Sequence, residues 1–225
     1  MKKVLYSLCV LLIASSCISI NVGNGENIHC KGPVVEKSME LSDFSSIVVN
    51  GSSDLSFTQA DAFSVVVTAN EEVFEYLDYK VEDGVLIIRH KNNVNIRAEK
   101  YDVAVSLPLL ASITVNGAAD VEQMGPYSAD QDLSVQVNGA GDLNFAGISV
   151  PGLRFTVNGA SDIKASGLDV QNLSVSVNGA GDAVLSGKAA SASFSVNGAG
   201  DIDARNLECE NVSTHKAGVA SIRLK

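Results

Sequence analysis

A six-residue phrase carries the side chains of this sequence that could do chemistry, because it repeats an Asn and an Asp at a nearly fixed spacing. In its first regular copy it reads Val115-Asn116-Gly117-Ala118-Ala119-Asp120. The Asp column comprises Asp120, Asp142, Asp162, Asp182 and Asp201, with an earlier member at Asp54. If the copies stack at the spacing of β-strands, about 5 Å, the carboxylates repel one another unless cations or N–H groups intervene.

Two roles are open to the Asp column. A ladder of carboxylates could bind Ca²⁺, with backbone carbonyls of the Gly-rich corners as further ligands. Alternatively, each carboxylate accepts N–H groups of its own corner, as in an Asx-turn. Each copy offers one such carboxylate, whereas Ca²⁺ takes about six to eight oxygens. We therefore predict a structural role, with no metal and no cofactor.

The Asn column comprises Asn116, Asn138, Asn158, Asn178 and Asn197. Stacked side-chain amides can hydrogen-bond from one copy to the next, so we predict a structural ladder here too. Together with the Asp residues, these corners also form the candidate face for a ligand.

The repeat indicates how these side chains are positioned. The Asn residues follow one another at spacings of 22, 20, 20 and 19 residues, a degenerate copy occupies 217–222, and an isolated early copy occupies 49–54. Such a nearly constant period is typical of arrays whose units cannot bury an apolar face alone. With 5% aromatic residues and no Trp, such layers are filled by Val, Ile, Leu and Ala.

Within a copy the period is two, which indicates strands with one buried face. Leu133, Val135 and Val137 alternate with Ser134 and Gln136. The pattern predicts that Val135, Val157, Val175 and Leu185 face inward and that Ser134, Gln136 and Ser176 face outward.

Two architectures fit these strands. Asn-Gly between alternating segments is a hairpin signal, which allows an antiparallel meander. Near-constant copy length and near-identical corners, with a second Gly corner at Gly147, Gly167 and Gly187, favour stacking. We predict an all-β fold, a right-handed single-stranded β-helix of about 20-residue rungs. Segment 60–107 has longer strands and a hairpin turn at 82–84, and could cap the open end of the regular rungs in 108–225.

The first residues are typical of a bacterial lipoprotein leader. Met1-Lys2-Lys3 is followed by the apolar run 4–13 and by Ala14-Ser15-Ser16-Cys17, which resembles a lipobox. An ordinary secretory signal is the alternative. We predict a signal peptide at 1–16, lipidation of Cys17, a lipid-anchored linker at 17–33 and one domain at 34–225. Ile18, and not Asp, follows the cysteine, which resembles the pattern of lipoproteins sorted to the outer membrane in better-known bacteria. The sequence does not decide which leaflet of that membrane holds the anchor.

Two cysteines remain besides Cys17 once Cys9 leaves with the leader. In an oxidising envelope Cys30 and Cys209 could form a disulfide. However, Cys209 follows Asn197 at the same separation along the chain at which Val150 follows Asn138. This register places Cys209 inward, as a buried free thiol.

Composition excludes several functions. A net charge of −10 argues against nucleic acid as a partner. His29, His90 and His215 show no metal-ligand spacing, and no phosphate loop or nucleophile elbow occurs. We predict no catalytic residues. The expected partners are a membrane, through the N-terminal lipid, and a protein or glycan ligand; the sequence specifies no oligomeric state.

At this point the chain resembles the Bacteroidetes family called putative auto-transporter adhesin, head GIN domain. The resemblance covers about residues 34–224 and is carried by the opening 43–51, by the strand 103–108 leading into 113–117, and by the serial phrases. It implies a right-handed β-helix on a secreted or lipid-anchored protein, and it brings no catalytic residues.

These observations favour a non-enzymatic envelope lipoprotein that acts as an adhesin or as a protein- or glycan-binding module. A structural or envelope-stress lipoprotein without external ligand is the first alternative. A carbohydrate-active β-helix enzyme is the second, and is disfavoured because outward positions are mostly Ser, Gln, Asn, Thr and Asp.

Overall fold

The computed structural model describes residues 26–92 and 94–225. The leader 1–16 and Cys17 lie outside the described residues. No helix in the described ranges is both long and apolar enough to cross a membrane.

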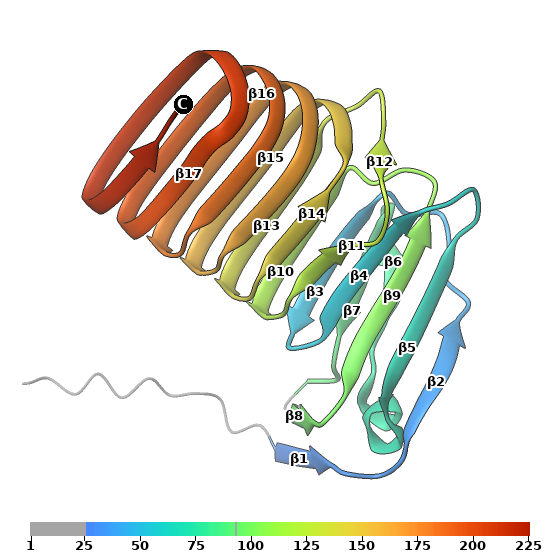
Figure 1. Ribbon diagram of the computed structural model, residues 1–225. Helices are drawn as coiled ribbons and strands as arrows, with labels where there is room; N and C mark the ends of the chain where they lie inside the picture. The colour runs from blue at the N-terminus through green and yellow to red at the C-terminus, as the bar shows by residue number, and fades with distance from the viewer. Residues whose placement is uncertain (1–25, 93) are drawn as a thin grey trace, which may run out of the picture.

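Residues 26–92 and 94–225 are all-β apart from one short 3₁₀ helix (Figure 1). The N-terminal part contains β1 (Glu26–Cys30), β2 (Val34–Met39), β3 (Ser46–Gly51), β4 (Asp54–Gln59), β5 (Ser64–Asn70), η1 (Glu71–Tyr76), β6 (Lys80–Glu82), β7 (Val85–Arg89), β8 (Val94–Ala98) and β9 (Tyr101–Leu107). The C-terminal part contains β10 (Ser112–Ala118), β11 (Val121–Gln123), β12 (Tyr127–Ser128), β13 (Leu133–Ala140), β14 (Leu143–Ala146), β15 (Ile148–Ala160), β16 (Ile163–Ala180) and β17 (Ala183–Arg223).

The repeated phrases stack in parallel. β3, β10, β13, β15, β16 and β17 pair side by side, each Asn of the phrase opposite the Asn of the next copy. A second row of parallel pairs joins β4, β11, β14, β16 and β17. In Figure 1 the chain winds from β10 to β17 as a stack of similar loops. We call residues 46–59 and 112–223 the coil, and the antiparallel meander is wrong for it.

The early copy of the phrase is not isolated in space. Asn50 in β3 lies opposite Asn116 in β10, although the two are far apart in the sequence. Segment 60–107 is therefore inserted between the first and second coil turns. Its strands extend both rows, because β7 pairs with β3 and β9 pairs with β4, in each case in parallel.

Beyond these neighbours the strand direction reverses. β6 pairs with β7, β5 with β9, and β2 with β5, all antiparallel. The expected hairpin joins β6 to β7, with Asp83 at φ 49° and Gly84 at φ 75°. The inserted segment thus covers the N-terminal end of the coil, as the sequence suggested.

The core of the coil follows the predicted alternation. Val135, Val157, Val175 and Leu185 are buried, each at most 1% exposed. The outward Ser134, Gln136 and Ser176 are half-buried, because side chains of stacked neighbours flank them. Burying one such aliphatic side chain stabilises the fold by about 1.5–3 kcal/mol, so the inward rows hold the stack together.

The glycine of the phrase is required by close stacking. A Cβ on Gly139 would lie 1.9 Å from the carbonyl oxygen of Gly117, and φ at Gly139 is 148°. A side chain there would clash with backbone that cannot move away. This explains why the Asn is followed by Gly in every copy.

Residues 26–33, placed in a linker by the sequence analysis, belong to the folded part. β1 pairs in parallel with β8, and the Glu72 carboxylate accepts N–H groups from Lys31 and Gly32. Cys30, in β1, is buried and free. Cys209 is also free, so the alternative disulfide is wrong, and it is only partly buried because it lies near the end of the coil.

Candidate functional site

The Asn column forms a continuous ladder along the coil. Each Asn Nδ2 donates a hydrogen bond of 2.9 Å to the Oδ1 of the Asn one coil turn before, from Asn197 back to Asn50. The expected amide-to-amide bonds are therefore present. Each amide has a partner on the neighbouring coil turn, which fixes the register of the stack.

The Asp column also bonds between coil turns, and the expectation that each carboxylate bonds its own corner is wrong. Asp120 Oδ1 accepts the backbone N–H of Asp142 at 2.8 Å, and Asp182 Oδ1 accepts that of Asp201 at 2.8 Å. The same contact links Asp54 to Asp120, Asp162 to Asp182, and Asp201 to Ser221. One carboxylate oxygen in each of these residues is thus used to join two coil turns.

One step of the Asp ladder departs from this pattern. Among the described residues, Asp142 accepts no hydrogen bond from the N–H of Asp162. The preceding corner residue there is Ser161, which is buried and whose Oγ has no partner. In the neighbouring copies Gly141 and Gly181 occupy this corner position. The hydrogen bond between coil turns is therefore missing at the copy in which Ser replaces Gly.

The Asp column has one further member, which the repeated phrases do not reveal. Asp102 in β9 lies opposite Asp54 and forms an ion pair with Lys100. At the other end, Arg223 pairs with Asp201 at 2.8 Å. A cation thus lies at each end of the carboxylate row. Asp102 lies outside the repeated phrase, and alternation within β9 alone could not reveal which strand β9 pairs with.

Burial and neighbouring carboxylates shift the pKa of the Asp in the first coil turn. Burial raises the pKa of Asp54, and the carboxylates of Asp120 and Asp102 raise it further, while the N–H of Asp120 opposes them. Near the last coil turn the opposite holds, because hydrogen bonds from Arg205 lower the pKa of Asp203 to about 2.

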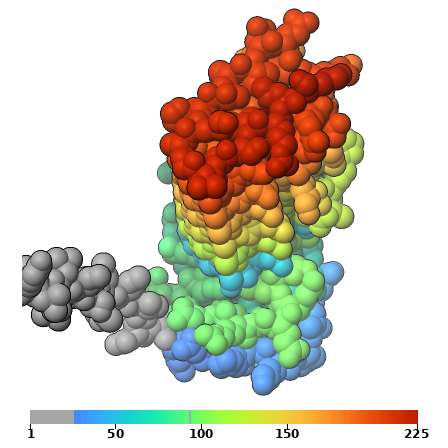
Figure 2. Space-filling model, turned by 60° about the vertical axis from the view of Figure 1, so that its left-hand side comes forward, coloured from blue at the N-terminus to red at the C-terminus, as the bar shows by residue number. Residues whose placement is uncertain are grey.

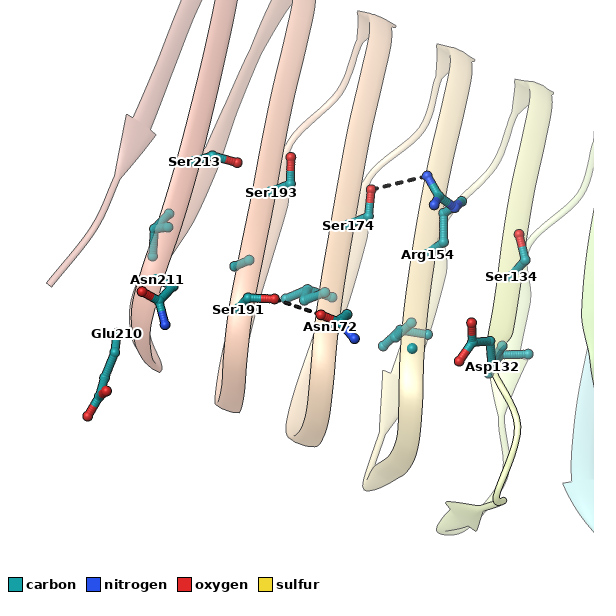
Figure 3. A pocket seen from close by; sticks show the side chains of 16 residues that line it. Asp132, Ser134, Arg154, Asn172, Ser174, Ser191, Ser193, Glu210, Asn211 and Ser213 are labelled. Atoms are coloured by element: carbon teal, nitrogen blue, oxygen red, sulfur yellow. Dashed lines mark hydrogen bonds between the residues drawn. The ribbon is translucent and has the colours of Figure 1, made fainter.

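A long groove lies on the outer side of the coil (Figure 3). It has a volume of about 980 Å³ and crosses successive coil turns from Asp132 to Ser213. One row at its edge is Ser134, Arg154, Ser174, Ser193 and Ser213. These residues are on the same side of their strands as the Asn ladder, because Ser134 and Asn138 are an even number of residues apart.

Hydroxyl and amide groups dominate this groove. Ser191 Oγ donates to Asn172 Oδ1 at 2.8 Å, and Arg154 Nη1 lies 3.4 Å from Ser174 Oγ. A smaller hollow of about 210 Å³ lies beside the Asp ladder, lined by Glu122, Asn144 and Lys164 among others. In residues 26–92 and 94–225, no group of three or more His, Cys, Asp or Glu side chains is arranged to hold a metal ion.

The fold and the groove define an all-β protein in which stacked parallel strands present a long polar outer face. The chain belongs to the family described as putative auto-transporter adhesin, head GIN domain, which matches residues 43–225. This confirms the resemblance drawn from the repeated phrases. The family description indicates a protein of the cell envelope or surface.

Solved structures share the fold. A putative adhesin from Parabacteroides distasonis superposes with a TM-score of 0.80 at 22% identity, covering 88% of this chain and 85% of that one. A putative lipid binding protein from the same species gives 0.77 at 21% identity, over 88% and 100%. A putative adhesin from Bacteroides fragilis gives 0.73 at 18% identity, over 88% and 100%. None of the three is described as an enzyme, and no curated protein matches the chain.

Proposed function

We propose that this protein is a non-enzymatic adhesin of the cell envelope that binds a protein or glycan through the outer face of its coil. The observation that carries the proposal is the groove from Asp132 to Ser213, where polar side chains repeat on successive coil turns. Hydrogen-bonding groups at a regular spacing suit an extended ligand that contacts several coil turns at once. Membership of an adhesin family supports the same role.

The architecture proposed for this role is a right-handed single-stranded β-helix with rungs of about 20 residues. The register supports it, because paired Asn residues are 22, 20, 20 and 19 positions apart from β10 to β17. In this proposal 1–16 is a signal peptide, Cys17 carries lipid and 34–225 is the binding domain. Outer-membrane anchoring then places the domain at a cell boundary.

Surface exposure tests the adhesin proposal. Intact cells are treated with proteinase, and the chain is then detected with an antibody, with a periplasmic protein as the protected control. An adhesin must be cut on intact cells, and beads coated with residues 26–225 must adhere to host or bacterial surfaces more than uncoated beads do. Full protection from proteinase, together with no bead adhesion, would contradict the role.

Lipidation is tested separately with Cys17→Ala. The variant is expected to accumulate as an unlipidated precursor that no longer partitions into detergent. Normal processing and wild-type partitioning would contradict the lipoprotein proposal.

The ladders favour a second candidate, a structural envelope protein without external ligand. The Asn amides hydrogen-bond one another, and most Asp carboxylates accept a backbone N–H group of the next coil turn. We propose that both columns are structural and need no Ca²⁺. The melting temperature is then expected to be equal in chelator and in about 1 mM Ca²⁺. A rise of many degrees that is lost when Asp142, Asp162 and Asp182 become Asn would contradict this.

A further inference from the structure

The groove contains one residue that breaks its row. Ser112, Ser134, Ser174 and Ser193 occupy equivalent positions on paired strands, and Arg154 stands between Ser134 and Ser174. The side chain of Arg154 is exposed and extends along the groove edge toward Ser174 (Figure 3). Stacking does not require an Arg here, since Ser suffices in the neighbouring coil turns.

Arg154 differs from three of the other four arginines, whereas Arg97, in β8, likewise forms no ion pair among the described residues. Arg89, Arg205 and Arg223 each pair with an aspartate at 2.6–2.8 Å. Among the described residues no carboxylate forms an ion pair with Arg154, and its one side-chain hydrogen bond is the 3.4 Å contact to Ser174. Most of its five N–H donors are therefore available to a ligand.

We propose that the groove binds an acidic glycan, with the Arg154 guanidinium holding a sugar carboxylate; this rests on the proposed adhesin function and names the class of its ligand. A guanidinium matches a carboxylate with two parallel hydrogen bonds, which a lone hydroxyl row cannot offer. The charged side chains of the groove are Asp132, Arg154 and Glu210, so in this chain of net charge −10 an anion would be attracted to the groove at Arg154 alone.

The groups around Arg154 fit a sugar better than a peptide. Ser134, Ser174 and Ser193 offer hydroxyls, and Asn172 offers an amide, at successive coil turns. Sugar hydroxyls can pair with such groups in either direction. The groove presents no aromatic side chain and its Leu residues are buried, so it lacks the apolar anchor pockets that peptide ligands use.

The length of the groove also fits an oligosaccharide. Its serine row spans four steps of strand spacing, about 19 Å in all, so several sugar units can lie along it. Asp132 and Glu210, toward its two ends, disfavour a ligand with a carboxylate at every position. The geometry thus points to a chain in which acidic sugars alternate with neutral ones, or to an acidic sugar at a chain end.

The test measures binding of residues 26–225 to an oligosaccharide of alternating glucuronate and N-acetylglucosamine and to a sialyl-oligosaccharide, each beside its methyl ester, by calorimetry in chelator. We expect at least one acid form to bind, and its neutral ester to bind at least tenfold more weakly. Arg154→Ser restores the serine of the neighbouring coil turns, so the variant should fold, and it should lose the preference. Lys164→Ser removes the same charge from the side bearing the Asp ladder and should bind as wild type does.

Equal binding of acid and ester, or unchanged binding in Arg154→Ser, would overturn the acidic-glycan proposal. So would binding that requires added Ca²⁺, because the contact would then run through a metal on the Asp ladder, and so would binding of neither acid. In each case, adhesion of coated beads would still support the adhesin function, which the proteinase and bead experiments test independently.

Discussion

The two ends of the coil are finished in different ways. At the N-terminal end, β7 and β9 continue the parallel rows and are then covered by antiparallel β6, β5 and β2. At the C-terminal end, the last coil turn is the outermost layer within the described residues, and Figure 2 shows it, in red, at the far end from the blue N-terminal strands. One end is covered by inserted chain, whereas no described strand covers the other, which we call the bare end.

The bare end differs in its inward residues. Gly218 packs against Gly198, which places Lys216 in line with Val196 and Thr214 in line with Phe194. Val196 and Phe194 are buried, whereas Lys216 and Thr214 are exposed. An inward-pointing charge on an edge strand is a known protection against pairing with another chain. The coil thus ends in added strands on one side and in polar inward positions on the other.

The largest expected effect contrasts an interior coil turn with the last one. Val175→Asp places a charge in an apolar layer and should destabilise by more than about 4 kcal/mol, or prevent folding. Thr214→Asp, at an inward position of the last coil turn, should cost less than about 1 kcal/mol because water reaches it. Chemical denaturation measures both, with Ser176→Asp as the outward control. Equal losses at 175 and 176 would rule out the alternation.

The second effect concerns backbone contact between coil turns. Gly139→Ala should destabilise by about 2–3 kcal/mol, because its Cβ would meet a carbonyl oxygen and its φ disfavours Ala. Gly125→Ala has a positive φ but nothing within 4 Å, so it should cost only about 1 kcal/mol. Thermal melting distinguishes them, and a similar loss in both would mean that strain, not stacking, fixes the glycines.

The third prediction concerns a variant in which the last coil turn has apolar inward residues, as the interior coil turns do. Replacing Thr214 and Lys216 together with Val should expose an apolar edge and cause concentration-dependent association. Analytical ultracentrifugation follows it, with Lys188→Val, on the side of the coil, as the control. A double variant that stays at the size of the wild type at every concentration would show that these residues do not protect the end.

The smallest effects compare carboxylates near the two ends. The pKa of Asp54 is raised in the folded state, so ionisation of this carboxyl disfavours folding. This cost is absent at a pH below the pKa of Asp54 in the unfolded chain, and it develops as the pH rises through the pKa in the folded protein. Asp54→Asn should therefore stabilise at pH 7, by no more than about 1 kcal/mol because water still reaches this partly desolvated side chain, and this gain should vanish in acid.

Asp203→Asn provides the control of opposite sign. The pKa of Asp203 is lowered to about 2 by Arg205, so its ionised form favours the folded state. This variant should lose stability at pH 7, and the loss should fade as pH falls toward 2. The same sign for both variants across the pH range would contradict the assignment.

The sequence predicted what depends on periodicity. Near-identical phrases at near-constant spacing require stacking in register, so the inward Val135 and the Asn ladder could be expected. It could not show that Asn50 stacks on Asn116, because the long segment between the two phrases carries no further copy. It also misassigned the partner of each Asp, since a carboxylate can reach either its own corner or the next coil turn and only backbone geometry decides between them.

The groove was beyond prediction for a related reason. Alternation places Ser134 and Arg154 outside, yet a concave surface depends on how the corners near Gly152 and Asn172 bend. Residues 26–33 looked like a linker because their tie to the domain, through Glu72 and β8, involves partners that are distant in the sequence. The pattern of neighbouring residues along the chain therefore predicts neither the groove nor the folded state of residues 26–33.

The hydrogen bonds between coil turns run along the stack, and this has a mechanical consequence. A protein held at its N-terminal part and pulled at its last coil turn carries the load along the same direction as those bonds. Because each coil turn contacts only its neighbours, the hydrogen bonds between coil turns would break one coil turn at a time, beginning at the bare end. The protein should then yield at low force but lengthen in small steps, absorbing a sudden pull before the N-terminal strands are strained.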